Sequence, residues 1–482
     1  MLYETIERAG SQQPEKPFLA KREVALSYRQ TLSQVGNLAA RIVARGRTGR
    51  PCLVQADDIA ACIGVLACLC VGKPFIVVNP NAPADRVDYY RQDSGADLIV
   101  YQSDFSAEGD RLAGKSLEVA DLQCSSEVWT TVVEADSVAC LIYTSGSTGQ
   151  PKAVVCPQAA MSFVAKAIGD TLGYEGSDVV LTALPMFFDF GLYQLFLAGR
   201  VGATVYFASS LESGLGLGKA LQRTGATILP MVPPAAEKLA NLASRGLSRN
   251  AVRMITTTGA ALDESTRLTL QQSWGSKVDV RVMYGLTECK RVAIMPAFES
   301  SRRTKASGIP LPGTTVTIRP HDGETVLNAE EIGEICVEGP HVMGGYHNQP
   351  DLTSRRYRRT PAGTVLRTGD TGFIDHDGYL HCLGRDDAQF KVQGYRVSSS
   401  EVVAAAKSAD DVVSAAVVPP AHGLQYTLFF QGTADEKSVA RVLSGRLEPH
   451  AVPKLIRRLV SLPTNPNGKV DMKQLEKEAR NG

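Results

Sequence analysis

The chain has 482 residues, with 51 Lys and Arg against 50 Asp and Glu, so its formal net charge is +1 at pH 7. This length exceeds what one ordinary core accommodates and predicts two or three domains. The balanced charge, without a basic block, argues against nucleic acid or an anionic membrane surface as partners. The cysteines form no Cys-x-x-Cys pair, which argues against structural zinc and favours buried, reduced thiols.

The N-terminal segment is acidic and amphipathic, unlike a signal peptide. The most apolar segment, Ile59–Gly72, ends at Lys73-Pro74 and is shorter than the about 20 residues needed to span a bilayer. It predicts a core helix. We therefore expect a cytoplasmic protein with no membrane-spanning segment.

Helical and strand patterns alternate along the first 300 residues. Amphipathic spacing predicts a helix at Leu32–Ala44, before the core helix. Short apolar runs predict strands at Pro51–Val54, Phe75–Val78, Leu98–Tyr101, Val179–Ala183, Thr204–Phe207, Thr227–Val232, Met254–Thr257 and Val278–Met283. This alternation predicts an α/β fold of layers with largely parallel sheets.

The texture of the sequence changes after about residue 310. Short strands and Gly-rich turns predict a β-rich subdomain over about 310–384. A boundary candidate lies at Gly384–Asp387, and the residues beyond it contain their own predicted helices and strands. We expect residues 1–384 to form a large N-terminal domain, and 385–482 a small α+β domain.

The segment Tyr143–Lys152 reads Tyr-Thr-Ser-Gly-Ser-Thr-Gly-Gln-Pro-Lys and follows the apolar run Val138–Ile142. Glycines let backbone N–H groups turn toward an anion, and hydroxyls and a lysine add donors, so the loop suits a polyphosphate. It is not a Walker A sequence, because Pro151 separates Gly149 from the lysine and disfavours a helix before it. A Ser/Gly-rich surface turn is the alternative.

A second motif, Tyr284–Glu288, follows a predicted strand, at the end where open α/β sheets place ligands. Tyr284 could stack on a base, Thr287 could bind a phosphate oxygen and Glu288 could hold Mg²⁺. The alternative is an aromatic turn with one surface glutamate.

Three further segments carry candidate polar residues. Arg367–Asp370 precedes a predicted strand, and the Asp370 carboxylate can accept hydrogen bonds from both ribose hydroxyls; a simple turn is the alternative. Arg385, at the domain junction, could reach a phosphate or ribose, unless the junction is a solvated linker. Lys469 ends a Pro/Asn/Gly loop, where most lysines are solvated.

Together, these ordered motifs resemble the adenylate-forming superfamily, which includes acyl-CoA synthetases, nonribosomal-peptide adenylation domains and aryl-acid ligases. The resemblance runs from Leu26–Arg29 and Val78–Pro83 to Lys469, nearly end to end. It implies that ATP and Mg²⁺ activate a carboxylic acid as acyl-AMP, with release of pyrophosphate. A phosphopantetheine thiol, on CoA or on a separate carrier protein, then takes the acyl group.

The resemblance also implies roles for individual residues. Lys469 is the mobile catalytic lysine, Thr287 faces a phosphate, Glu288 binds Mg²⁺, and Asp387 is the hinge of a mobile C-terminal domain. The remaining nucleotide-binding residues are Thr144, Ser145, Gly146, Ser147, Thr148, Gly149, Lys152, Gly259, Ala260, Ala261, Tyr284, Gly285, Asp370 and Arg385.

The segment Pro185–Tyr193 resembles the one that begins the acid pocket. Asp189 aligns with the aspartate that binds the substrate ammonium in amino-acid-activating members, and Phe190 and Tyr193 make the pocket bulky and flat. Met283 and Arg291 are further pocket candidates, and Arg291 could meet a second polar group of the substrate. Alternatively, Asp189 pairs with a protein cation and the aromatic residues are core.

The sequence departs from the usual family pattern at Cys289–Arg291 and at Val397–Glu401. We expect a free-standing ligase that loads a small amino or aromatic acid onto a carrier protein. An acyl-CoA ligase of general metabolism is the alternative. A non-catalytic homologue has no reason to keep the whole set Lys152, Thr287, Glu288, Asp370, Arg385 and Lys469.

Overall fold

The computed structural model describes residues 1–82, 84–102, 116–119, 133–144, 151–244, 251–259, 261–274, 278–361, 363–385, 389–392, 395–419, 425–447, 451–466 and 468–480. The chain divides into two compact units. Unit 1 comprises Met1–Thr317, Cys336–Thr368 and Ile374–His381; unit 2 comprises Ile318–Ile335, Gly369–Phe373 and Cys382–Gly482. Unit 2 thus takes in segments that precede residue 384, and the domain boundary expected there stays a prediction.

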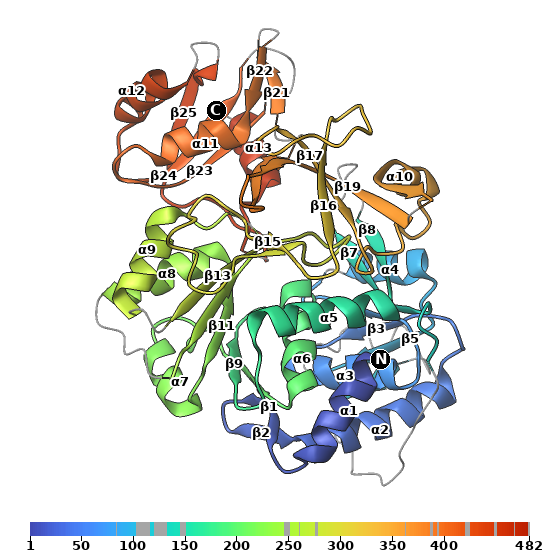
Figure 1. The fold of residues 1–482 in the computed structure, drawn as a ribbon. Helices are drawn as coiled ribbons and strands as arrows, with labels where there is room; N and C mark the ends of the chain where they lie inside the picture. Colours follow the sequence, from blue (N-terminus) through green and yellow to red (C-terminus); the bar gives the residue numbers. More distant parts are fainter. Residues whose placement is uncertain are drawn as a thin grey trace. The chain divides into compact units, whose positions relative to one another are not determined.

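A nine-stranded sheet forms one half of unit 1 (Figure 1). Its strand order is β15-β14-β13-β12-β11-β9-β10-β1-β2, and the strands from β13 to β1 are parallel. In that order the strands are Ile309–Pro310, Ala293–Ile294, Asp279–Tyr284, Met254–Thr257, Ile228–Met231, Val179–Thr182, Thr204–Phe207, Pro17–Lys21 and Val24–Ser27.

The second sheet of unit 1 has six strands in the order β6-β5-β3-β4-β7-β8, and only β8 is antiparallel to its neighbour. These strands are Ser116–Glu118, Leu98–Tyr101, Cys52–Gln55, Phe75–Val77, Val138–Thr144 and Lys152–Pro157. Strand β8 begins directly after Pro151, and residues 145–150 of the phosphate-loop candidate lie outside the described residues.

Helices α5 (Gln158–Leu172) and α6 (Asp189–Val201) lie between the two sheets (Figure 1). Helix α5 packs on β7 and β8, α6 packs on β9 and β10, and the two helices contact each other. Because both flanks of α6 are covered, most of its residues are buried and it lacks one polar face. Its N-terminus therefore brings Asp189 to the interior of unit 1.

Among the other helices of unit 1, α3 contacts strands of both sheets, and α1 packs on α2, α3, α5 and α6. Ser27 begins α2 with a capping box, in which its hydroxyl accepts from Gln30 N–H and the Gln30 side chain accepts from Ser27 N–H. These helices are α1 Leu2–Gln12, α2 Tyr28–Arg45, α3 Asp58–Cys70, α4 Ala84–Ser94, α7 Leu217–Thr224, α8 Pro233–Ser244, α9 Glu264–Trp274 and α10 Pro350–Arg356. Helix α3 confirms the predicted core helix.

Several strands contribute residues to both units. Within unit 1, β18 (Tyr357–Thr360) pairs with the start of β19 (Gly363–Ile374) in an antiparallel hairpin. The chain passes between the units along β16 Thr315–Arg319, β17 Gly333–Glu338, β19 and β20 Leu380–Arg385.

Unit 2 is an α+β unit. A three-stranded sheet of β23 (Val412–Val418), β24 (Thr427–Gly432) and β25 (Leu455–Leu459) packs with α11 (Ser399–Lys407) and α12 (Glu436–Arg446) around a buried core. Helix α13 (Met472–Arg480) closes a second core through its buried Leu475. A hairpin of β21 Gln389–Val392 and β22 Tyr395–Ser398 completes the unit. The α/β fold class, with a large N-terminal and a small C-terminal domain, is confirmed.

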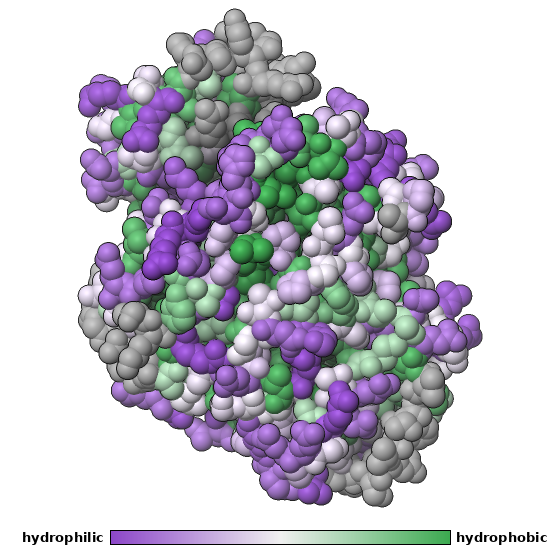
Figure 2. Space-filling model, in the orientation of Figure 1, coloured by the Kyte–Doolittle hydropathy of each residue, from purple (hydrophilic) through white to green (hydrophobic). Residues whose placement is uncertain are grey.

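On the drawn face of unit 1, hydrophilic side chains are interspersed with smaller groups of apolar ones (Figure 2). Within the described part of the chain, no helix combines the length and the hydrophobicity that a bilayer crossing requires.

His341 is fully buried in unit 1, and burial lowers its pKa to about 4. The native state keeps this imidazole neutral, whereas the unfolded chain binds a proton below about pH 6.5. Stability should therefore fall as the pH drops below 6.5, by about 2 kcal/mol at pH 5. We expect thermal melting of a His341→Phe variant to depend less on pH between 7 and 5 than that of the wild type. An equal dependence would contradict the assignment.

Candidate active site

The turn after β13 folds back tightly on itself. Val292 N–H donates to the carbonyl of Tyr284 at 2.9 Å, and a Cβ at Gly285 would meet the Lys290 carbonyl oxygen at 2.0 Å. Only glycine allows this close approach. Lys290 itself has a φ of 61°, an uncommon conformation for a residue with a side chain. The turn thereby directs Thr287, Glu288 and Lys290 into the interior of unit 1.

Glu288, Lys152 and Tyr346 form a connected polar group. Tyr346 Oη donates to Glu288 Oε1 at 2.6 Å, and Lys152 Nζ lies 2.9 Å from Tyr346 Oη and 3.4 Å from Glu288 Oε1. Lys152 also lies 4.0 Å from the centre of the Tyr346 ring. Since residues 344–347 hydrogen-bond along β8, the backbone fixes Tyr346 beside Lys152.

Asp189 lies at the N-terminus of α6, where the helix dipole favours a carboxylate. Thr287 Oγ1 donates to Asp189 Oδ2 at 3.4 Å, and Lys290 Nζ lies 3.9 Å from the same oxygen. The alternative of a protein cation beside Asp189 is therefore realised, although this separation exceeds hydrogen-bond length.

Lys290 is buried near Cys140 of β7 and Cys156 of β8, and its Nζ lies 5.9 Å from the centre of the Tyr193 ring. Burial alone would lower the pKa of Lys290, but Cys156 and Asp189 beside it outweigh burial and raise it. Burial would raise the pKa of the Cys156 thiol, but a hydrogen bond with Cys140 and the Lys290 charge lower it. Cys140 and Cys156 are register partners across the two strands.

Arg291 is buried between β12 and α6. Its Nη1 donates to Thr258 Oγ1 at 2.5 Å, and the guanidinium lies 5.6 Å from the centre of the Phe190 ring. Burial lowers the pKa of Arg291, yet a guanidinium stays charged in proteins. A cavity of about 10 Å³, the size of one water molecule, is lined by Phe190, Tyr193, Thr256, Met283 and Arg291 among others. Four of the five predicted acid-pocket residues thus meet in one place, next to the fifth, Asp189.

The predicted nucleotide residues of unit 1 are only partly described. Thr144 ends β7, with its hydroxyl 3.4 Å from the Lys152 carbonyl. Gly259 follows β12 with a φ of 94°, a conformation that favours glycine, and Ala261 is exposed. Tyr284 ends β13. Ser145, Gly146, Ser147, Thr148, Gly149 and Ala260 lie outside the described residues.

The remaining candidates belong to unit 2. Asp370 is buried and lies within β19, so its segment is itself part of a strand and does not precede one as expected, and the alternative of a simple turn is not realised. Lys469 is exposed on a tight loop, where Asn465 N–H donates to its carbonyl and its own N–H donates to Asn465 Oδ1. Arg385 is the last residue of β20, but its side chain and the whole of Asp387 lie outside the described residues.

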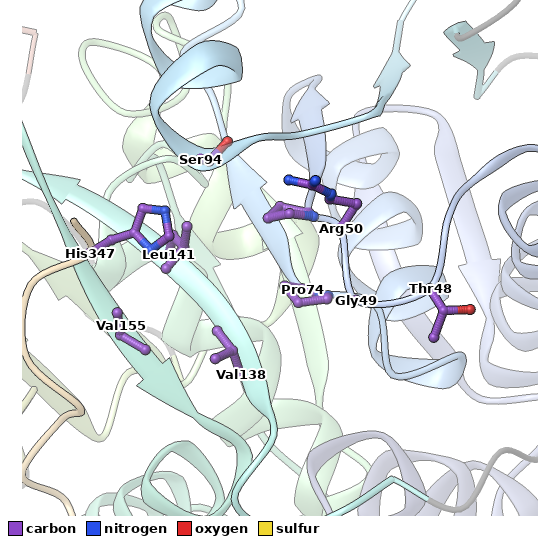
Figure 3. Close-up of a pocket in the computed structure, with 10 residues that line it drawn as sticks. Thr48, Gly49, Arg50, Pro74, Ser94, Val138, Leu141, Val155 and His347 are labelled. Atoms are coloured by element: carbon purple, nitrogen blue, oxygen red, sulfur yellow. The ribbon is translucent and has the colours of Figure 1, made fainter.

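A separate cavity of about 340 Å³ opens on unit 1, and none of the predicted site residues lines it (Figure 3). Thr48, Arg50, Ser94 and His347 supply its polar side chains, and Leu141 of β7 and Val155 of β8 supply part of its apolar wall. In Figure 3, His347 and Arg50 lie on different sides of this space.

The sequence matches the family model of AMP-binding enzymes over residues 6–347. The chain belongs to the AMP-binding enzyme family. It is thereby an adenylating, AMP-forming ligase by class. Three relatives of the chain at 28–29% identity are much longer proteins, and the chain spans 35% of the length of one and 19% of the other two.

Other AMP-binding enzymes match the chain over most of their length. The D-alanine--D-alanyl carrier protein ligase of Bacillus licheniformis is 26% identical, over 99% of both chains. ATP-bound MatB from Rhodopseudomonas palustris is 25% identical, with a TM-score of 0.85 over 99% of both chains. VinN in complex with L-aspartate is 30% identical, with a TM-score of 0.69 over 80% of this chain and 98% of that one.

The sequence interpretation missed Tyr346 and did not place Lys290 in the pocket. Tyr346 lies far along the chain from both residues that it bonds, in a Gly-Gly-Tyr-His segment with no recognised motif. The inward direction of Lys290 depends on its positive φ, which no local pattern signals. The one sequence signal at Lys290 was its place in Cys289–Arg291, where the sequence departs from the family pattern.

The donor set fits a magnesium nucleotide. Mg²⁺ prefers oxygen ligands and is usually held by one or two carboxylates together with substrate phosphates. Glu288 offers one buried carboxylate and Thr287 a hydroxyl, and the described residues contain no cluster of three or more His, Cys, Asp or Glu that could hold a metal alone. Glu288 would hold the metal, which would neutralise phosphate charge when bound.

Proposed function

We propose that the protein activates a small amino acid with ATP and loads it onto the phosphopantetheine thiol of a separate carrier protein. In the first step the acid's carboxylate oxygen bonds to the α-phosphorus of ATP, and pyrophosphate leaves. In the second step the thiol sulfur bonds to the acyl carbon, and AMP leaves with the electron pair of the broken C–O bond. Adenylation is needed because a free carboxylate has no good leaving group.

The position of Asp189 carries this proposal. Its carboxylate lies in the interior of unit 1, 3.4 Å from the hydroxyl of Thr287, the residue that we assign to the phosphate. An amino acid whose ammonium binds Asp189 would have its carboxylate close to the phosphoryl group under attack. This placement lowers the entropic cost of the reaction. A half-buried carboxylate gains from such a counter-ion.

Two similarities support an amino acid and a carrier. The D-alanine--D-alanyl carrier protein ligase matches this chain over nearly its full length, and VinN was solved with L-aspartate. Each of the two proteins is thus reported with an amino acid, D-alanine in one case and L-aspartate in the other. Comparing the rates of acyl transfer to CoA and to a carrier protein tests the acceptor. Equal rates would favour the acyl-CoA ligase alternative.

Replacing Asp189 with alanine tests the amine site. We expect the variant to lose about 100-fold or more in kcat/KM for its amino acid in ATP–pyrophosphate exchange, since a substrate ammonium would be left without its partner. The deaminated analogue of the same acid should react equally poorly with wild type and variant. An unchanged preference for the amino acid would remove Asp189 from this role.

A further inference from the structure

Two buried cations adjoin the amine site. The Lys290 side chain is 2% exposed and Arg291 is 7% exposed. Lys290 Nζ makes no well-aligned hydrogen bond, and Arg291 Nε makes none, within the part of the chain that the structure describes. A buried charge without a partner is costly, so such groups are normally matched by an opposite charge.

The charges of this group do not balance. Asp189 supplies one negative charge, 3.9 Å from Lys290, whereas Lys290 and Arg291 supply two positive charges. Lys152 is already matched by Glu288. Among the described residues, Arg291 hydrogen-bonds to the neutral hydroxyl of Thr258 and to no carboxylate. One further negative charge would therefore neutralise the group of Asp189, Lys290 and Arg291.

We infer that Lys290 and Arg291 form a receptor for a second carboxylate of the substrate, so that the protein activates a short dicarboxylic amino acid. The inference rests on the proposed function and names the substrate class for the same site. The substrate ammonium takes Asp189, the second carboxylate takes Lys290 and Arg291, and every buried charge then has a partner. The contact between Asp189 and Lys290 opens as the substrate enters.

The distances limit the length of the substrate. Asp189 Oδ2 lies 3.4 Å from Thr287 Oγ1 and 3.9 Å from Lys290 Nζ, so the amine site adjoins both the phosphoryl side and the cations. The carbon that carries the amine must therefore lie within one or two bonds of each carboxyl carbon. An aspartate-sized amino acid meets this condition, and a longer acid such as glutamate fits it less well.

The positive φ of Lys290 is consistent with a functional position. A residue with a side chain in this conformation stores strain, which persists when the surroundings require a particular side-chain direction. The thiols of Cys156 and Cys140, which are soft and weakly polar, lie near the Lys290 ammonium. Cys156 is also a rival counter-ion, since a thiolate there would balance Lys290 without any substrate.

The test is ATP–pyrophosphate exchange by the full chain with L-aspartate, L-glutamate, L-asparagine, L-glutamine and L-alanine. We expect kcat/KM for aspartate to exceed that for asparagine by about 100-fold or more, because asparagine has nearly the same shape without the charge. Succinate, which lacks the amine, should inhibit the aspartate reaction competitively. A best rate with a neutral amino acid overturns the receptor and leaves the proposed function standing. Exchange with no amino acid, but with another carboxylic acid, overturns the proposed function itself.

Variants separate the receptor from a structural role. Lys290→Met and Arg291→Met should lower the aspartate-to-asparagine ratio about 100-fold, mainly through the KM for aspartate. Arg50→Met, which removes an exposed cation of the separate cavity, is the matched control and should leave the ratio unchanged. Cys156→Ser should also keep the ratio. If instead the serine variant alone acquires a preference for aspartate, the thiolate is the counter-ion and the receptor is wrong.

Discussion

Replacing Lys469 with alanine is expected to lower the rate of acyl-adenylate formation by about 10²–10³-fold. The proposed first step brings an anionic carboxylate to an anionic phosphate, and a positioned cation that stabilises the developing charge is worth about this factor. The backbone around Lys469 is held by reciprocal hydrogen bonds with Asn465, whereas the side chain is exposed. A rigid loop with a projecting lysine suits a group that acts in one step only.

The same substitution should leave the second step nearly unchanged. When the acyl-adenylate is prepared chemically and supplied with a holo-carrier protein, the variant should form the thioester at close to the wild-type rate. Lys473→Ala, an exposed lysine at the start of α13, is the matched control and should affect neither step. Adenylate formation at the wild-type rate by the Lys469 variant would show that this lysine is only solvated.

Most of the fold could be predicted because its elements have strong local signals. Parallel strands buried on both faces read as continuous apolar runs, and the runs at 204–207 and 254–257 coincide with β10 and β12. The segment around Asp370 was placed before a strand, with a turn as the alternative, because Thr-Gly-Asp is turn-like in composition. In the structure, pairing within a long strand overrides this local preference.

The part of the candidate site that comes from one turn could be predicted from the sequence. Thr287 and Glu288 come from a single motif after a strand, and their interior position follows from the end of β13. The contacts of Tyr346 and the match between Asp189 and Lys290 join residues about 60 to 200 positions apart. No local pattern encodes such pairs, since they depend on how β8 and α6 pack.

The sequence did, however, restrict the possible partners of Asp189 to two. Asp189 was assigned either to a substrate amine or to a protein cation, and the structure shows a cation at a distance too long for a hydrogen bond. Both assignments therefore describe one site in two states, empty and filled, under the proposed function. The departure at Cys289–Arg291 from the family pattern becomes the feature that selects the acid.

Replacing Glu288 with glutamine is the second change for which we expect a large effect, at least about 100-fold on kcat for adenylate formation. The variant keeps the shape and a hydrogen-bond acceptor for Tyr346 Oη, which lies 2.6 Å from Glu288 Oε1, but it loses the charge that would bind Mg²⁺. The Mg²⁺ concentration for half-maximal rate should therefore rise about 10-fold or more. Tyr346→Phe, which removes the hydrogen bond and keeps the carboxylate, should raise it less, because the charge that would bind the metal remains.

The competing explanation is that Glu288 only neutralises Lys152, which lies 3.4 Å away. In that case the glutamine variant would leave Lys152 unmatched, and adding Lys152→Met to it would restore much of the lost activity, since the pair would be removed together. A metal role predicts the opposite, because removing Lys152 takes away a second group that meets the phosphates. A titration of Mg²⁺ across the wild type, both single variants and the double variant therefore decides between the two roles. An unchanged half-maximal Mg²⁺ concentration, with activity recovered in the double variant, would mean that Glu288 is no metal ligand.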